Sequence, residues 1–205
     1  MGLVLNYTIN QTPLDEDERE GLKIKSISTR EELNEFEQQN IETAIAWLSG
    51  RAITLDNFLT EKFVMNLHFR MFNEVWLWAG TFRLSDKTIG IDSHYIGVEI
   101  KKLLDNCKYW IDNKTFSEEE IAIRLKHRLV QIHPFPNGNG RHSRLMADIM
   151  MEKIFNKPIF SWGGISMSSV DNGSSEYIKA LREADEGDFE PLLEFAQLNG
   201  GRIAK

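Results

Sequence analysis

The residues best suited to chemistry stand together in the run HPFPNGNGRHSR, at positions 133–144. Within it, Asn137, Gly138, Asn139 and Gly140 tolerate unusual backbone angles, and they come directly before a segment with helical character. Free amide N–H groups at the start of a helix can bind an anion, and glycines let a phosphate approach the backbone closely. The run therefore predicts a phosphate-binding loop that leads into a helix.

Two arginines follow this loop. Arg141 and Arg144 are three residues apart, so on a helix they share a face. Both can donate charge-assisted hydrogen bonds to phosphate oxygens. Two cations at the positive end of a helix repel the helix dipole and each other unless an anion is bound, so they favour an anionic ligand.

His133 stands at the opposite side of the loop, at the end of a predicted amphipathic helix. Imidazole can accept a proton from an attacking hydroxyl near neutral pH. A base beside a phosphate cradle is the minimum equipment for phosphoryl or nucleotidyl transfer.

The bulk composition is that of one globular domain. The chain has 205 residues, 41% of them hydrophobic and 27% charged, and a net charge of −7. This charge argues against direct nucleic-acid binding and against a polybasic membrane anchor. The single cysteine, Cys107, cannot form an internal disulfide, and we find neither a signal peptide nor an apolar run long enough for a membrane helix. We therefore expect a cytoplasmic protein.

Hydrophobic spacing and capping signals predict a mostly helical chain. Thr29 with Glu32 and Ser117 with Glu120 have the spacing of capping boxes. The helices are predicted at about 29–48, from 55 onward, around 98–111, 117–132, 139–154, 176–185 and 190–198. Between Trp78 and Tyr95, the run TFRLSDKTIGID predicts a short β-hairpin that turns at Ser85–Lys87. The domain boundaries that follow are an irregular arm at 1–28, a helical region at 29–54, a main domain at 55–198 and a tail at 199–205.

The motif resembles the signature of the Fic family, HxFx[D/E]GNGRxxR. The matching positions are His133, Phe135, Gly138, Asn139, Gly140, Arg141 and Arg144. The resemblance covers roughly Leu55 to Leu198, and the whole chain is similar to a bacterial subgroup, mobile mystery protein B, named for its occurrence on mobile elements. It implies an all-α fold, here a single Fic-type helical domain with the short β-hairpin as a flap.

The resemblance also implies an activity and a role for each motif residue. Most members transfer AMP from ATP to a Ser, Thr or Tyr hydroxyl of a target protein. His133 would be the base, Gly138–Gly140 would cradle phosphates, Arg141 would hold the α/β-phosphate region and Arg144 the γ-phosphate. The flap would pair with the target's backbone as an added strand. Its candidate residues are Thr81, Phe82, Arg83, Lys87, Thr88, Ile89 and Gly90. A helix-turn-helix regulator and a second copy of the chain are further expected partners.

Two positions depart from the family pattern. Asn137 stands where the signature has the acidic residue expected to hold Mg²⁺, so we expect Mg²⁺ to arrive with ATP and to be held more weakly by the Asn137 carbonyl oxygen. The family's inhibitory helix, [S/T]xxxE[G/N], is matched here only by Ile41-Glu42, which makes Glu42 the candidate inhibitory residue; the alternative is a solvated helix position.

Three functions stay open at this point. The first is AMP transfer, and Gly140 keeps the pattern typical of nucleotidyl transfer. The second is transfer of the γ-phosphate from a nucleotide bound in the reverse direction. The third is a nucleotide-sensing or partner-binding module that lost efficient catalysis through Asn137.

Overall fold

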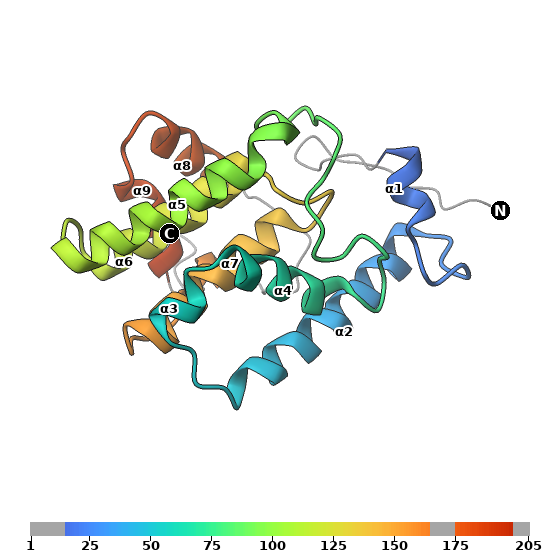
Figure 1. Ribbon diagram of the computed structural model, residues 1–205, viewed down its shortest axis with the longest axis horizontal. Helices are drawn as coiled ribbons and strands as arrows, with labels where there is room; N and C mark the ends of the chain where they lie inside the picture. Colours follow the sequence, from blue (N-terminus) through green and yellow to red (C-terminus); the bar gives the residue numbers. More distant parts are fainter. Residues whose placement is uncertain (1–14, 165–174, 199–205) are drawn as a thin grey trace, which may run out of the picture.

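The computed structural model describes residues 15–164 and 175–198, and the regular structure in these ranges is helical (Figure 1). The α-helices are α1 (Glu16–Glu20), α2 (Arg30–Ser49), α3 (Leu55–Phe58), α4 (Glu61–Phe72), α5 (Ile96–Asn113), α6 (Glu118–Ile132), α7 (Asn139–Ile149), α8 (Ser175–Asp185) and α9 (Glu190–Gln197). Short 3-10 turns lie at Ser93–Tyr95 and Trp162–Gly164, and α7 continues as a π-helical turn at Met150–Ile154. The predicted helical fold is confirmed.

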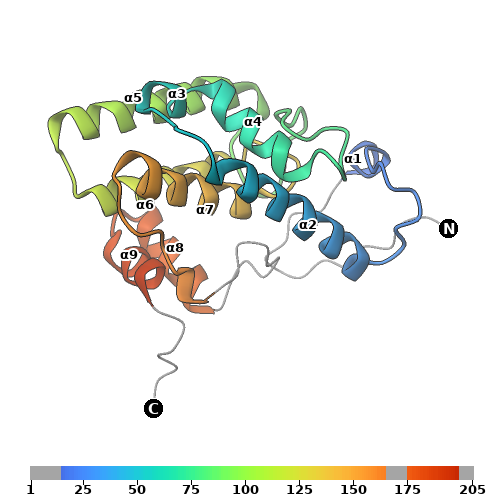
Figure 2. The same ribbon diagram turned by 90° about the horizontal axis from the view of Figure 1, so that it is seen from below.

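Helix α7 lies in the middle of the molecule. Figure 2 shows it between α4 and α5 on one side and α8 and α9 on the other, and it packs against α4 and α6. Every residue of α7 except Gly140 is buried, although the helix begins with the polar run NGRHSR. Burying a polar group is costly unless it finds a partner, so the surroundings of α7 must supply partners for its side chains.

The predicted helix starts agree with the observed caps. The Thr29 hydroxyl accepts a hydrogen bond from the Glu32 amide at 3.2 Å, and the Ser117 hydroxyl accepts one from the Glu120 amide at 3.2 Å. The helix predicted from Leu55 is interrupted after Phe58, because the Thr60 hydroxyl accepts from the Phe63 amide at 3.1 Å and starts α4 anew.

The N-terminal arm is not wholly irregular. Asp15 caps α1, and its amide donates to Glu18 Oε2 at 2.8 Å. Farther along, Leu22 and Trp76 form an isolated antiparallel bridge. The first fourteen residues of the predicted arm and the predicted tail at 199–205 lie outside the described residues. Within the described ranges, no helix is long and apolar enough to cross a bilayer.

The predicted β-hairpin is wrong: residues 81–92 form a loop without strands, drawn in green between α4 and α5 in Figure 1. A hairpin needs its two arms to pair with each other. Instead the Arg83 amide donates to the Pro134 carbonyl at 2.9 Å, and the Ile91 amide donates to the Ile132 carbonyl at 3.4 Å. The loop therefore pairs with the end of α6 and with the motif. We keep the name flap for residues 81–92.

Candidate active site

His133 ends α6 and begins the motif loop. Its amide still donates to the Leu129 carbonyl at 3.0 Å, but its φ of 52° is left-handed, which turns the chain out of the helix. The residue is 8% exposed. Burial, together with the positive charges of Arg83 and Lys87, lowers the pKa of His133 to about 4. The imidazole is therefore neutral at neutral pH, the form that can accept a proton.

The Asn139 side chain holds the motif loop in shape. Its Oδ1 accepts from the Phe135 amide at 2.9 Å and its Nδ2 donates to the Phe135 carbonyl at 2.8 Å. Asn139 was predicted to bind phosphate. It is 3% exposed, and its side chain forms hydrogen bonds within the loop itself. The group that Asn139 leaves for an anion is therefore its backbone amide, at the start of α7.

Gly138 is the residue that precedes α7, and the geometry requires glycine there. Its φ is 78°, and a Cβ at this position would lie 2.4 Å from Cζ of Phe72. Gly138 has no side chain to cap α7, so the first-turn amides of the helix are left for another acceptor. An anion is the natural one.

Arg141 is buried among partners from α2 and α4. Its Nη2 lies 2.8 Å from Oε2 of Glu37, and its guanidinium lies 4.9 Å from the centre of the Phe72 ring. Glu37 Oε1 accepts from Trp76 Nε1 at 2.6 Å. Nη1 of Arg141 is buried and has no hydrogen-bond partner among the described residues. One donor of Arg141 is thus fixed, and another is left for a ligand.

Arg144 faces a different group of buried residues. It is 1% exposed, and burial lowers its pKa, while Tyr177 and Asp148 favour its charged form and Arg141 opposes it. Lys126, itself fully buried, donates to the Tyr177 hydroxyl, and the Arg144 charge contributes to holding the pKa of Lys126 well below its ordinary value. The buried positive charge of Arg144 favours a bound anion in this region, and such an anion would also favour the protonated form of Lys126.

His68 connects Gly80, the residue directly before the flap, to the motif loop, and the sequence analysis missed it. Its Nδ1 accepts from the Gly80 amide at 2.9 Å, and its Nε2 lies 3.0 Å from the Asn137 carbonyl oxygen. This arrangement assigns the proton to Nε2. The ring also stacks on Phe135 at 3.7 Å. The signal in the sequence was its place among the apolar residues of α4, where a buried histidine needs two hydrogen-bond partners.

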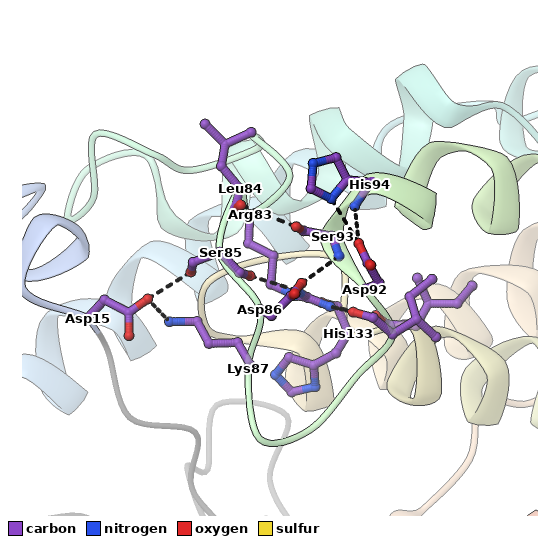
Figure 3. Close-up of polar contacts among 12 residues, drawn as sticks. Asp15, Arg83, Leu84, Ser85, Asp86, Lys87, Asp92, Ser93, His94 and His133 are labelled. Carbon is purple, nitrogen blue, oxygen red and sulfur yellow. Dashed lines mark hydrogen bonds and ion pairs between the residues drawn. The ribbon is translucent and has the colours of Figure 1, made fainter.

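The flap residues divide into buried and exposed sets. Arg83 was predicted to face a target, which is wrong, because it is 2% exposed and its guanidinium bonds to backbone carbonyls (Figure 3). The Lys87 side chain is 4% exposed and pairs with Asp15 at 2.8 Å and with Glu18 at 2.5 Å, so it too is turned inward. Of the flap residues predicted to bind a target, Thr81, Thr88, Ile89 and Gly90 are exposed, and Phe82 is half-buried against Phe135.

The candidate inhibitory residue, Glu42, lies at the surface of α2. Its side chain accepts from Gln38 Nε2 at 3.0 Å. The carboxylate that pairs with a motif arginine is that of Glu37, one and a half turns earlier on α2. The structure therefore gives no support to an inhibitory role for Glu42.

The sequence and fold of this chain resemble those of known proteins. The model of the Fic/DOC family matches residues 58–151, a range that contains α4, the flap, α5, α6 and α7. This chain carries a Fic/DOC family domain.

Among curated relatives, the "Protein adenylyltransferase Fic" of Aedes aegypti is 24% identical over 159 residues, which are 76% of this chain and 30% of the relative. The protein of the same name from Drosophila grimshawi is 26% identical over 141 residues, 67% of this chain and 28% of the relative. The chain thus spans less than a third of the length of these relatives.

Solved Fic domains share the fold. The N-terminal Fic domain of the Bep8 protein from Bartonella sp. 1-1C has a TM-score of 0.66 and 16% identity, and the match covers 90% of this chain and 93% of that one. The N-terminal Fic domain of a putative cell filamentation protein from Bartonella quintana, solved with bound ADP, has a TM-score of 0.62 and 17% identity. That match covers 84% of this chain and 86% of the other.

The Fic/DOC domain depends on residues outside the matched range. Glu37 pairs with Arg141 from α2, and Tyr177 of α8 lies beside Lys126 and Arg144. Because both contacts are buried, the flanking helices complete the motif's surroundings.

A resident metal site does not fit the residues present. The Asn137 side-chain oxygen accepts from the Gly138 amide at 2.6 Å, which occupies one of its two acceptor positions. Within residues 15–164 and 175–198, no group of three or more His, Cys, Asp or Glu side chains could hold a metal ion. Position 137 offers Mg²⁺ a neutral amide oxygen, a weak substitute for a carboxylate.

Proposed function

We propose that this protein is a protein adenylyltransferase, which transfers AMP from ATP to a Ser, Thr or Tyr hydroxyl of a target protein. The observation that carries the proposal is the arrangement at the two ends of the motif loop. At one end stands His133, neutral and able to accept a proton. At the other are the uncapped start of α7 and Nη1 of Arg141, which has no hydrogen-bond partner in the described part of the chain. A hydroxyl and a nucleotide phosphate are the reactants that these groups suit.

The reaction follows from these roles. The target hydroxyl oxygen attacks the α-phosphorus of ATP while His133 accepts the hydroxyl proton. The bond from the α-phosphorus to the bridging oxygen of the β-phosphate breaks, and pyrophosphate leaves with the electron pair. The α7 amides and Arg141 bind the phosphate oxygens. The positive charge of Arg144, which is buried, attracts the γ-phosphate. Catalysis then comes from positioning and from charge stabilisation.

The negative charge of a bound nucleotide would also change the pKa of His133. A pKa near 4 makes His133 neutral but weakly basic in the absence of ligand. A polyphosphate nearby favours the protonated imidazole and raises this pKa toward neutrality. The base then becomes stronger when the substrate is bound, as efficient proton transfer requires.

Two sets of relatives support the proposal. The curated relatives bear the name protein adenylyltransferase, and a solved Fic domain of similar fold contains ADP. A target protein of unassigned identity, a second copy of the chain and a helix-turn-helix regulator are proposed as partners on the family resemblance alone. Mg²⁺ is proposed to enter with ATP, held mainly by the phosphates, and no catalytic step requires the protein to hold it.

A binding module is the second candidate, and Asn137 favours it. If the missing carboxylate removes efficient catalysis, nucleotide binding remains without transfer. The test is incubation of the purified protein and a cell extract with Mg²⁺ and ATP labelled at the α- or the γ-phosphate. Protein bands labelled from the α-position alone are the expected result. Labelling from the γ-position alone would establish phosphotransfer, and retained ATP binding without either label would establish the binding module.

A further inference from the structure

The Arg83 guanidinium is buried and shared between two segments of the chain (Figure 3). Toward the end of α6, its Nε donates to the His133 carbonyl at 2.7 Å and its Nη2 to the Ile132 carbonyl at 3.4 Å. Toward the flap, Nη1 donates to the Ser85 carbonyl at 2.7 Å, and Nη2 donates to the Ile91 carbonyl. A planar group with five N–H donors can serve all four carbonyls; a lysine ammonium cannot.

These hydrogen bonds supply donors to carbonyl groups at the end of α6. The last carbonyl groups of a helix receive no hydrogen bond from an N–H group of the same helix, and they carry its negative partial charge. At the end of α6, the left-handed turn at His133 exposes the Ile132 and His133 carbonyls to Arg83. The cation satisfies these carbonyls, and in doing so it fixes the peptide that carries the His133 side chain.

The flap also touches His133 directly. Gly90 has a φ of 113°, and a Cβ there would lie 2.7 Å from the Cβ of His133 and 2.8 Å from Nη2 of Arg83. The flap backbone therefore packs against both residues, in a space that only glycine leaves open. His133 is held from the carbonyl side by Arg83 and from the side of its Cβ by Gly90.

The charged groups around His133 come from the flap and the arm. Arg83 lies 3.7 Å from Asp86, and Lys87 pairs with Asp15 and Glu18. Both cations oppose protonation of the imidazole, and Arg83 does so more than Lys87. Removal of the Arg83 charge should therefore leave a measurable signature on the base itself.

We propose that Arg83 is a positioning residue for catalysis, which joins the flap to the backbone of His133 and so sets where the imidazole meets the target hydroxyl. Arg83 touches neither substrate nor nucleotide in this account. The inference rests on the proposed function for its effect on rate, but its effect on the geometry and titration of His133 stands without it.

The experiment compares the unmodified 205-residue chain with Arg83→Met, Arg83→Lys and, as a matched control, Arg182→Met at an exposed position of α8. Circular dichroism verifies folding, and imidazole NMR follows the titration of His133, assigned by its loss in His133→Ala. Transfer from α-labelled ATP gives the rate. With Arg83→Met we expect a raised pKa of His133 and a rate lower by roughly 10- to 100-fold. With Arg83→Lys the rate also falls, but the pKa rises less because the charge is kept.

Further variants keep the test decisive. Gly90→Ala leaves Arg83 intact and adds the Cβ that meets both residues, so it should also shift the His133 resonances and slow transfer. If Arg83→Met does not fold, Arg83→Lys and Gly90→Ala decide the matter. A folded Arg83→Met with unchanged His133 titration and unchanged rate would overturn the proposal. If the wild type transfers no label, the proposed function fails, and an unaltered His133 titration in the Arg83 variants would separately refute the positioning role.

Discussion

The carboxylate of Glu37 and the guanidinium of Arg141 form an ion pair at 2.8 Å, with both side chains at most 4% exposed. Glu37 belongs to α2, outside the range matched by the Fic/DOC model, and Arg141 belongs to the motif. A buried pair of this kind is weak evidence of net stabilisation, but the loss of one partner leaves an uncompensated charge. The helix that precedes the family domain is thereby coupled to Arg141, the arginine that we propose binds phosphate.

Glu37→Gln is expected to destabilise the protein by about 3 kcal/mol, because Arg141 would stay buried without its counter-charge. The amide can still accept from Trp76, so the change isolates the charge. Urea unfolding measures the effect. Glu35→Gln, at an exposed position of the same helix, is the control and should change stability by less than about 0.5 kcal/mol. Equal effects in the two variants would contradict a structural role for the pair.

Gly138→Ala is expected to disrupt the motif loop. The new methyl group would meet the Phe72 ring at 2.4 Å, and the φ of 78° is unfavourable for alanine. A residue forced into such a conformation costs on the order of 1–3 kcal/mol, and movement of Phe72 would also disturb Arg141. Calorimetric ATP binding should weaken or vanish. Gly50→Ala is the control, since a Cβ there meets no atom within 4 Å; if both variants bind ATP like the wild type, the loop is not the phosphate site.

Asn137→Asp is expected to strengthen the effect of Mg²⁺ on nucleotide binding. A carboxylate near the metal adds a unit charge, worth up to roughly 4 kcal/mol before desolvation at an effective dielectric of about 20. The ratio of ATP affinities with and without Mg²⁺ should rise by roughly tenfold or more relative to the wild type. Calorimetry at millimolar Mg²⁺ gives this ratio, with Asn106→Asp on the exposed face of α5 as the control. An unchanged ratio would mean that position 137 does not face the metal.

The protein is expected to lose stability as the pH falls from about 6.5 to 4. Burial lowers the pKa of His133 and His142 to about 4 and that of His68 well below its usual value, so each would take up a proton on unfolding. Burial raises the pKa of Asp148 to about 7, so this carboxyl would release a proton on unfolding and partly offset the histidines. The histidines outnumber this carboxyl, so unfolding takes up protons on balance and the free energy of unfolding falls as the pH falls through this range. Urea unfolding at several pH values measures it, and a flat profile in this range would contradict the buried neutral histidines.

The sequence predicted much of the helical fold, because its signals are local. Capping residues such as Thr29 and Ser117 and the periodic apolar positions mark helices without knowledge of the rest of the chain. The motif loop was predictable for a similar reason, since residues 137–140 are adjacent and the resemblance to the Fic signature is continuous. The narrower resemblance to mobile mystery protein B stays a prediction.

The features that the sequence did not predict all depend on distant partners. The flap has the composition of a hairpin, but its backbone pairs with Ile132 and Pro134, which no local pattern indicates. Arg83 has the appearance of an exposed hairpin charge until the end of α6 is placed beside it. Glu37 was overlooked in favour of Glu42, because which face of α2 meets Arg141 is decided by packing against α4.

The central claim is that His133 is the base for transfer of AMP, and one comparison tests it most directly. Purified wild type, His133→Ala and the exposed control His94→Ala are incubated with α-labelled ATP, Mg²⁺ and a cytoplasmic extract, and protein-bound label is measured. We predict labelled bands with the wild type and with His94→Ala, and a loss of roughly 100-fold or more with His133→Ala. Equal labelling by wild type and His133→Ala would contradict the account.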